Sequence, residues 1–208
     1  MHSHKHHQGR KRLATVAVAA MLVSLATAGH AQSESATSFP RAYFGATVGA
    51  SAYSLDCAGF SSCDDTDTGY KAYAGLRLMR PLAVEVSYID FGKATGAYYY
   101  GYYYYTNFSI EAHAWTLSAA GQLSFTQNLT GIGRLGLANV TATETSNGRS
   151  VSTTSIKPYL GLGLTYAFAP HLRGVASADF TSGEVDYGNG VKDNGSMGLF
   201  SVGLQFDF

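Results

Sequence analysis

The stretch SMGLFSVGLQFDF, residues 196–208, alternates apolar side chains with mostly small or polar ones. The apolar positions in its second half are Phe200, Val202, Leu204, Phe206 and Phe208. The positions between them are Leu199, Ser201, Gly203, Gln205 and Asp207. Successive side chains of a β-strand point to opposite faces, so this pattern predicts a strand with one apolar and one polar face.

The same alternation recurs about eight times, for example in YKAYAGLRL (70–78) and IKPYLGLGLTYAF (156–168). The polar faces are rich in glycine and poor in Lys and Glu, and only 13% of the chain is charged. Aromatic residues close the apolar faces, as Tyr166 and Phe168 do, which is typical of strands that end at a membrane interface. A sheet in lipid must close to pair its backbone groups, so we expect a transmembrane β-barrel. The alternative is a secreted sandwich with the leucines inside.

The turn residues divide the chain into eight expected strands of an all-β, antiparallel, eight-stranded barrel. The strands are expected near residues 42–55, 69–80, 82–94, 108–126, 129–145, 151–169, 172–186 and 196–208. Short turns are expected at Arg80-Pro81, Gln127-Asn128 and Pro170-His171, and long loops over Asp56–Thr68, Thr95–Asn107, Thr145–Ser150 and Tyr187–Asn194. Short turns on one side and long loops on the other are typical of outer-membrane barrels.

The first 31 residues have the features of a signal peptide. A basic start precedes the uncharged stretch 13–28, and Gly29-His30-Ala31 offers small residues for cleavage. We therefore expect a signal peptide over 1–31, a short N-terminal periplasmic segment over 32–41 and one barrel domain over 42–208. A retained membrane anchor is the alternative. Four of the fourteen Lys and Arg residues but none of the fourteen acidic residues precede residue 32, so the remaining chain has a formal charge of −4. No basic face indicates nucleic-acid binding.

Export would place the cysteines in an oxidising compartment, so we expect a disulfide between Cys57 and Cys63, with two free thiols as the alternative. Asp64, Asp65 and Asp67 follow in the same loop. Clustered carboxylates can bind calcium, but a calcium site needs six to eight oxygens, so we expect a solvated acidic loop instead. No metal or cofactor is expected.

Three motifs resemble those of the OmpA-type small outer-membrane barrels, and the resemblance covers residues 42–208. TGYKAYAGLRLMRPLAVEVSYIDFGK (68–93) resembles the hairpin of the second and third strands, and KPYLGLGLTYAF (157–168) resembles the sixth strand. LFSVGLQFDF (199–208) resembles the closing strand, whose final Phe208 would be the assembly signal read by the barrel-assembly machinery. The family's larger members add a periplasmic peptidoglycan-binding domain, which is not expected here. The resemblance implies a monomer in contact with outer-membrane lipids and lipopolysaccharide, serving membrane integrity, adhesion or passage through a narrow pore.

If the apolar sets face lipid, the barrel interior receives a set of charged side chains. They are Lys71, Arg77, Glu85, Arg134, Lys157, Arg173, Asp179 and Asp207. The interior of an eight-stranded barrel is just wide enough to be filled by side chains, so we expect these charges to pair as a plug. An ion gate is the alternative, and the excess of cations would give any leak a mild anion preference.

Glu111 and His113 lie on the outward face of their strand, beyond the ten residues from Trp115 to Phe125 that cross the hydrocarbon. With Ser109 they could form a Ser-His-Glu constellation of a lipid-modifying enzyme. No acyl-hydrolase motif surrounds His113, so we expect three ordinary exposed residues at a strand end. We expect no catalytic residues and no enzyme activity.

The segment GAYYYGYYYYTNF, residues 96–108, places seven tyrosines within eight positions of an expected outer loop. They are Tyr98, Tyr99, Tyr100, Tyr102, Tyr103, Tyr104 and Tyr105. Tyrosine gives contact area at low entropic cost, so the loop suits adhesion to a host surface or a glycan. Alternatively, the two flanking strands extend beyond the bilayer and the tyrosines pack as cross-strand pairs. The sequence thus predicts a structural barrel with an adhesive loop, and a narrow pore for small solutes is the second interpretation.

Overall fold

The computed structural model describes residues 42–54, 62–100, 104–146, 149–186 and 192–208. Within these ranges the chain forms β1 (Ala42–Tyr53), β2 (Ser62–Asp64), β3 (Thr66–Met79), β4 (Leu82–Tyr100), β5 (Tyr104–Ser124), β6 (Leu129–Ser146), β7 (Arg149–Ala169), β8 (Leu172–Asp186) and β9 (Lys192–Asp207). No helix in these ranges has the length and apolarity to cross a membrane. The expected signal peptide and the segment 32–41 lie outside the described residues.

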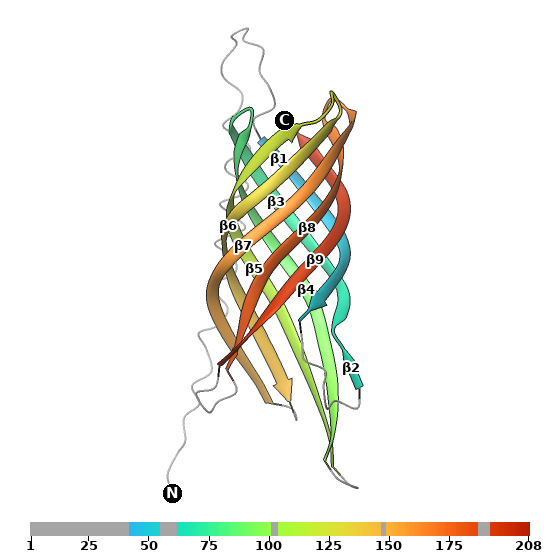
Figure 1. Ribbon diagram of the computed structural model, residues 1–208, viewed down its shortest axis with the longest axis vertical. Helices are drawn as coiled ribbons and strands as arrows, with labels where there is room; N and C mark the ends of the chain where they lie inside the picture. The colour runs from blue at the N-terminus through green and yellow to red at the C-terminus, as the bar shows by residue number, and fades with distance from the viewer. Residues whose placement is uncertain (1–41, 55–61, 101–103, 147–148, 187–191) are drawn as a thin grey trace, which may run out of the picture. The chain divides into compact units, whose positions relative to one another are not determined.

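Eight of these strands close into one antiparallel barrel (Figure 1). Chain neighbours pair in order from β3 to β9, and β1 closes the ring by pairing with both β3 and β9. The short β2 adds to the outer part of β4, where Cys63 lies opposite Gly96. The predicted eight-stranded antiparallel barrel is confirmed. Closure leaves the spanning strands without a free edge, as a sheet in hydrocarbon requires.

The two faces of the barrel wall differ as the alternation predicts. On the outside, Leu135 is 69% and Ile156 is 71% exposed, and Leu160, Leu162 and Leu164 are about half exposed. The secreted sandwich, which would bury these leucines, is therefore the wrong interpretation. An apolar outer surface is what lipid contact requires.

Aromatic side chains gather near both ends of this apolar surface. At the end with the short turns, the Phe44 ring lies 6.0 Å from Phe206 and 5.5 Å from Phe208. Toward the other end, the Tyr88 ring lies 5.1 Å from Trp115 and 6.2 Å from Tyr70. These two groups resemble the aromatic girdles of membrane barrels, which lie at the two interfaces.

The C-terminus lies at the end of the barrel that has the short turns. There the Phe208 amide donates to the Ala42 carbonyl over 2.9 Å. Short turns face the periplasm in outer-membrane barrels, so the opposite end is the outer one. The outer loops are shorter than expected. The largest correction concerns Thr95–Asn107, because β4 continues to Tyr100 and β5 begins at Tyr104. Tyrosine favours extended backbone, and pairing the two strands gives hydrogen-bond partners to their backbone amides.

The other outer loops change in the same direction. β6 and β7 reach Ser146 and Arg149, so most of the loop expected over Thr145–Ser150 is strand. The expected loop Asp56–Thr68 contains β2 and the start of β3, and β9 begins at Lys192 within the expected loop Tyr187–Asn194. In β4, a bulge between Asp90 and Lys93 contains Gly92 at φ 69°, a conformation that glycine adopts without strain. Beyond the bulge the inward positions change from odd to even numbers.

Candidate functional site

Four charged side chains from four strands meet inside the barrel. Lys71 Nζ lies 2.8 Å from Asp179 Oδ1 and 3.7 Å from Glu85 Oε1. Arg134 Nε donates to the same Glu85 oxygen over 2.7 Å. All four side chains are at most 1% exposed. This central network contains two cations and two anions, so its formal charges balance without solvent.

Tyrosines complete the central network. The Tyr159 hydroxyl donates to Asp179 Oδ1 and accepts from Lys71 Nζ over 3.0 Å. The Tyr43 hydroxyl donates to Glu85 Oε2 over 3.1 Å. The hydroxyls therefore supply hydrogen bonds to the buried carboxylates, as burial of a charge requires.

The sequence analysis did not include these tyrosines in the site. Their inward face follows from the alternation, but their partners lie across the barrel: Lys71 and Asp179 are 108 positions apart. Alternation fixes the face of a residue and leaves the cross-barrel partner open. Of the Arg134 nitrogens, Nη1 and Nη2 have no hydrogen-bond partner among the described residues. Burying these nitrogens without hydrogen bonds costs free energy. The Arg134 guanidinium carbon lies 5.5 Å from the centre of the Tyr73 ring, and this cation–π contact offsets part of that cost.

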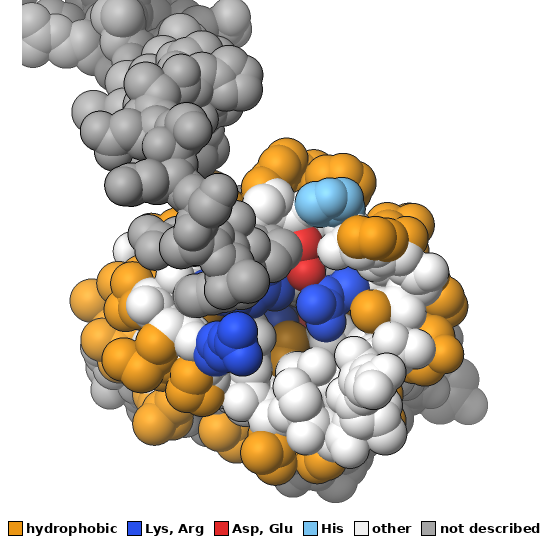
Figure 2. Space-filling model, turned by 90° about the horizontal axis from the view of Figure 1, so that it is seen from above, with side chains coloured by type: hydrophobic (Ala, Val, Ile, Leu, Met, Phe, Trp, Pro, Cys, Tyr) orange, Lys and Arg blue, Asp and Glu red, His pale blue; other side chains and the backbone are white. Residues whose placement is uncertain are grey.

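A second charged group closes the periplasmic end. Asp207 is fully buried, and its two oxygens lie 3.1 Å from Arg77 Nη2 and 2.6 Å from Arg173 Nε. The Gln205 amide also donates to Asp207 Oδ1 over 2.7 Å. Figure 2, which views the barrel from this end, shows basic side chains gathered around acidic ones inside a ring of apolar side chains.

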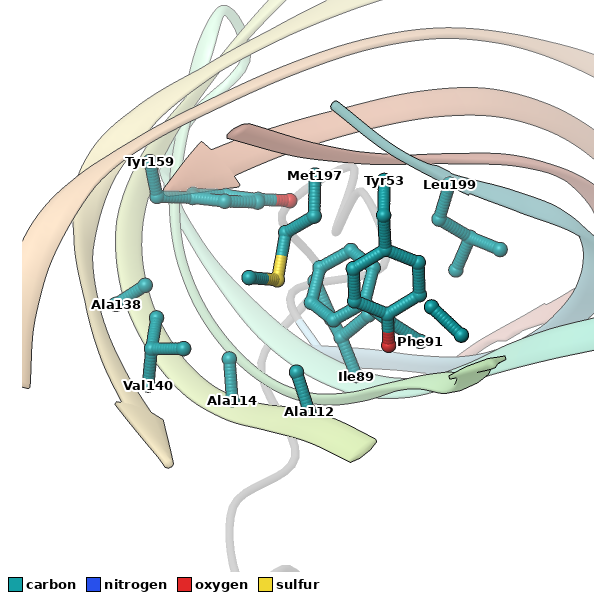
Figure 3. Close-up of a cluster of buried hydrophobic side chains, with 11 residues drawn as sticks. Tyr53, Ile89, Phe91, Ala112, Ala114, Ala138, Val140, Tyr159, Met197 and Leu199 are labelled. Carbon is teal, nitrogen blue, oxygen red and sulfur yellow. The ribbon is translucent and has the colours of Figure 1, made fainter. Parts of the chain in front are cut away.

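The outer half of the lumen contains an apolar cluster (Figure 3). Ile89, Phe91 and Leu199 are fully buried, and Met197 lies between Tyr159 and Tyr53 in this view. The cluster is Tyr53, Ile89, Phe91, Ala94, Ala112, Ala114, Ala138, Val140, Tyr159, Met197 and Leu199. Farther out, Lys157 Nζ lies 3.2 Å from Glu184 Oε2, a partner that the sequence analysis missed. Including Glu184, the charged groups at these three levels comprise five cations and four anions, so the cation excess is smaller than expected.

The residues weighed for enzyme chemistry make other contacts. Glu111 Oε1 lies 2.6 Å from Lys93 Nζ, and both side chains are about half exposed. The His113 ring packs against Tyr88 with 6.0 Å between centres. Among the described residues, no hydrogen bond joins His113 to Ser109 or Glu111.

The acidic segment after Cys63 binds backbone amides. Asp64 Oδ1 accepts from the Thr66 amide over 3.2 Å, and Asp67 Oδ2 accepts from the Lys93 amide over 2.7 Å. No group of three His, Cys, Asp or Glu side chains suited to a metal occurs in the described part of the chain. Cys63 is not a free thiol. Cys57 lies outside the described residues, so the disulfide between them stays a prediction.

The tyrosine-rich segment forms the outer part of the β4–β5 hairpin. The backbone register places Tyr98 opposite Thr106, Tyr99 opposite Tyr105 and Tyr100 opposite Tyr104. Tyr102 and Tyr103 lie outside the described residues. The backbone thus follows the alternative in which the strands extend beyond the bilayer.

Comparison with known protein families identifies the family of this barrel. The sequence model of the family described as OmpA-like transmembrane domain matches residues 39–208, the whole barrel. The chain belongs to this family. This OmpA-like barrel therefore belongs in the outer membrane, and the resemblance noted from its motifs is confirmed. No curated protein matches the sequence.

Solved structures of small outer-membrane barrels share the fold of this OmpA-like chain. Ail, the attachment invasion locus protein of Yersinia pestis, is 15% identical with a TM-score of 0.54, over 82% of this chain and 100% of Ail. Neisserial surface protein A is 19% identical with a TM-score of 0.56, over 80% and 97%. The N-terminal barrel of Pseudomonas aeruginosa OprF is 18% identical with a TM-score of 0.51, over 81% and 98%. At these identities the likeness shows the fold alone.

Proposed function

We propose that the protein is a closed structural barrel of the outer membrane that presents the tyrosine-rich β4–β5 hairpin to ligands outside the cell. The filled lumen is the observation that carries this proposal. Buried ion pairs occupy two levels, and the apolar cluster occupies the level between the central network and the outer end. A solute would have to displace all three.

Opening such a lumen is energetically costly. Glu85 contacts both Arg134 and Lys71, so moving any one of these side chains leaves another buried charge without its partner. Breaking a buried ion pair costs about 3–5 kcal/mol. The apolar cluster also excludes water from the outer half of the lumen, so an ion that entered it would lose its hydration at a high cost in free energy. These costs favour a structural role over the narrow pore.

The outer surface then becomes the working part of the molecule. β4 and β5 are 19 and 21 residues long, about twice the ~9–11 residues that a tilted strand needs to cross the hydrocarbon. Their outer halves therefore project from the membrane, and the segment 98–105 contains seven tyrosines in eight positions. Antibody contact loops use tyrosine for the same purpose, since its ring gives a large contact at low entropic cost. Within the described residues, the backbone ladder of β4 and β5 continues to Tyr100 opposite Tyr104.

The ligand class that this surface suits is a sugar or aromatic group able to stack on tyrosine rings. Ail shares the fold and is named for attachment, a property that belongs to Ail. The proposal for this chain rests on its own hairpin.

Binding of the refolded, detergent-solubilised barrel to an array of neutral oligosaccharides tests the hairpin. Replacing residues 98–105 with Gly and Ser should abolish binding. The matched control replaces Thr143, Thr145, Ser150 and Ser152 of the β6–β7 hairpin with Gly, and it should bind like the unmodified protein. Gel mobility before and after boiling shows that each variant is folded. Binding that survives the loss of the tyrosines, or an array that retains none of the three proteins, contradicts the proposal.

A further inference from the structure

The barrel wall opens between β7 and β8 toward the outer end. Their ladder ends at Leu160 opposite Phe180, yet β7 extends outward to Arg149 and β8 to Asp186. In the described part of the chain, the outer portion of β7 pairs only with β6, and that of β8 pairs only with β9. The gap between the two portions is named the β7–β8 seam.

Pro158 explains where the seam begins. It lies two residues beyond Leu160 on the same edge of β7, and it has no N–H to donate to β8. Its carbonyl accepts from the Thr181 hydroxyl over 2.9 Å instead of from a backbone amide. The ion pair of Lys157 and Glu184 is the next contact outward. Side chains therefore join β7 to β8 at the seam in place of a backbone ladder.

Gly183, in the outer portion of β8, faces the lumen. A Cβ at Gly183 would stand 2.7 Å from Met197 Cε and 3.8 Å from Val140 Cγ1 of β6. Both of those side chains belong to the apolar cluster of the lumen. The inner face of this portion of β8 therefore lies at the level of the apolar cluster.

A pocket of about 560 Å³ lies at the mouth of the seam, and its lining residues come from β7, β8, β9 and the end of β1. On its outer side lie Leu160, Phe180 and Phe200, which belong to the lipid-facing surface and are 37–55% exposed. On its inner side lie Tyr53 and Met197, each only 6% exposed. The pocket lining therefore includes residues of the lipid-facing surface and residues of the apolar cluster. Its size lies within the ~300–1,000 Å³ of ligand sites.

The position of the pocket along the barrel indicates what fills it. On β9, ten residues separate Phe206 of the periplasmic aromatic group from Ser196 at the pocket, about the span of the hydrocarbon. The pocket is thus at the boundary of the outer leaflet. Ser54, Ser182 and Ser196 supply hydroxyls to its lining. An apolar slot that opens to the bilayer and carries hydroxyls at the interface matches a chain of methylenes that ends in an ester.

We propose that the seam binds one acyl chain of an outer-leaflet membrane lipid. The methylene chain packs between Leu160 and Phe180 and reaches Met197, while the ester end remains near the serine hydroxyls. Burial of apolar surface on both partners supplies the affinity. The site lies in the wall and is separate from the tyrosine-rich hairpin.

Photolabelling from within the bilayer tests this site. The folded protein is reconstituted in phosphatidylcholine vesicles that contain phosphatidylcholine with a diazirine at the end of one acyl chain. After illumination, mass spectrometry compares labelling of Met197 with labelling of Tyr73, a lumen-facing side chain in another buried cluster. The proposal predicts more label on Met197 than on Tyr73. Equal labelling of the two residues overturns it.

Two variants close the site in different ways. Pro158→Val restores an N–H that can extend the ladder, and Ser196→Phe fills the pocket without changing β7. Each should reduce Met197 labelling to the level of Tyr73, whereas Ile156→Val, a lipid-facing change on the same strand, should leave it unchanged. The boiled and unboiled gel mobilities confirm that each variant is folded. Persistent Met197 labelling in both closing variants overturns the proposal, as does a cross-linked pair of barrels joined through the seam in place of lipid label.

Discussion

Arg134 Nε and Lys71 Nζ approach the same carboxylate oxygen of Glu85, at 2.7 and 3.7 Å, inside a barrel where all three side chains are at most 1% exposed. One acidic residue therefore bridges two cations that come from different strands. Asp179 balances the second positive charge through Lys71. The stability of the barrel and the closure of its lumen depend on the same few contacts.

Removal of the Glu85 charge should show how much the central network contributes. Glu85→Gln leaves Arg134 and Lys71 to share the Asp179 charge, so we expect the free energy of unfolding to fall by about 3–5 kcal/mol. Urea unfolding in detergent micelles, followed by tryptophan fluorescence, measures the change. The control is Glu111→Gln, which breaks the exposed pair with Lys93 and should have a much smaller effect. Similar losses in the two variants would show that the network does not stabilise the barrel.

A charge on the outer surface should reveal which part of that surface lies in hydrocarbon. Leu135 is 69% exposed and pairs with Ala119, near the middle of the span from Trp115 to Phe125. Leu135→Arg should cost about 2–4 kcal/mol, because an arginine at the bilayer midplane is poorly solvated.

The matched control is Val151→Arg, which is also on an exposed side chain but close to the outer end of β7. Near the interface the cost should fall to about 0–1 kcal/mol. Unfolding of both variants in lipid vesicles measures the difference. Equal costs would contradict the assigned membrane position.

Glycines on the two faces should differ in their tolerance of a methyl group. A Cβ at Gly203 would clash with the Ala46 carbonyl oxygen and lie 2.6 Å from Thr47 Cα, both backbone atoms of β1. Gly203→Ala should therefore destabilise the barrel by about 1–3 kcal/mol, as overpacking does. At Gly133 a Cβ would meet nothing within 4 Å, so Gly133→Ala should be neutral or gain up to ~1 kcal/mol. The urea unfolding midpoint of each variant, compared with that of the unmodified protein, measures these effects. An unchanged midpoint for Gly203→Ala would contradict the tight contact between β9 and β1.

Strict alternation made most of the barrel predictable. In β9, each step from Phe200 to Phe208 changes the face, so one register places the aromatic residues outside and Gln205 and Asp207 inside. The partners across the barrel were less accessible, since the pairing of Lys71 with Asp179 depends on strand stagger and tilt. Glu184 was missed as the partner of Lys157 for the same reason.

Two local features of strand pairing could not be predicted from the alternation. The tyrosine-rich segment contains Gly101 and was expected to be a loop, but strand pairing continues to Tyr100 and resumes at Tyr104. The alternation in 156–168 continues through Pro158, so it indicates one uninterrupted strand, and β7 is indeed continuous there. The proline changes only the pairing with β8, an effect that a single-strand pattern does not contain.

Single-channel recording in planar bilayers tests the closed lumen most directly. The barrel is added from the same preparation that shows a heat-dependent shift on gels, so that absence of current does not reflect unfolded protein. The filled lumen predicts insertion without stable conductance steps over the voltages that the membrane withstands. Regular, reproducible steps from the unmodified protein would contradict the closed barrel and favour the narrow pore, and the reversal potential in a salt gradient would then show whether anions pass preferentially.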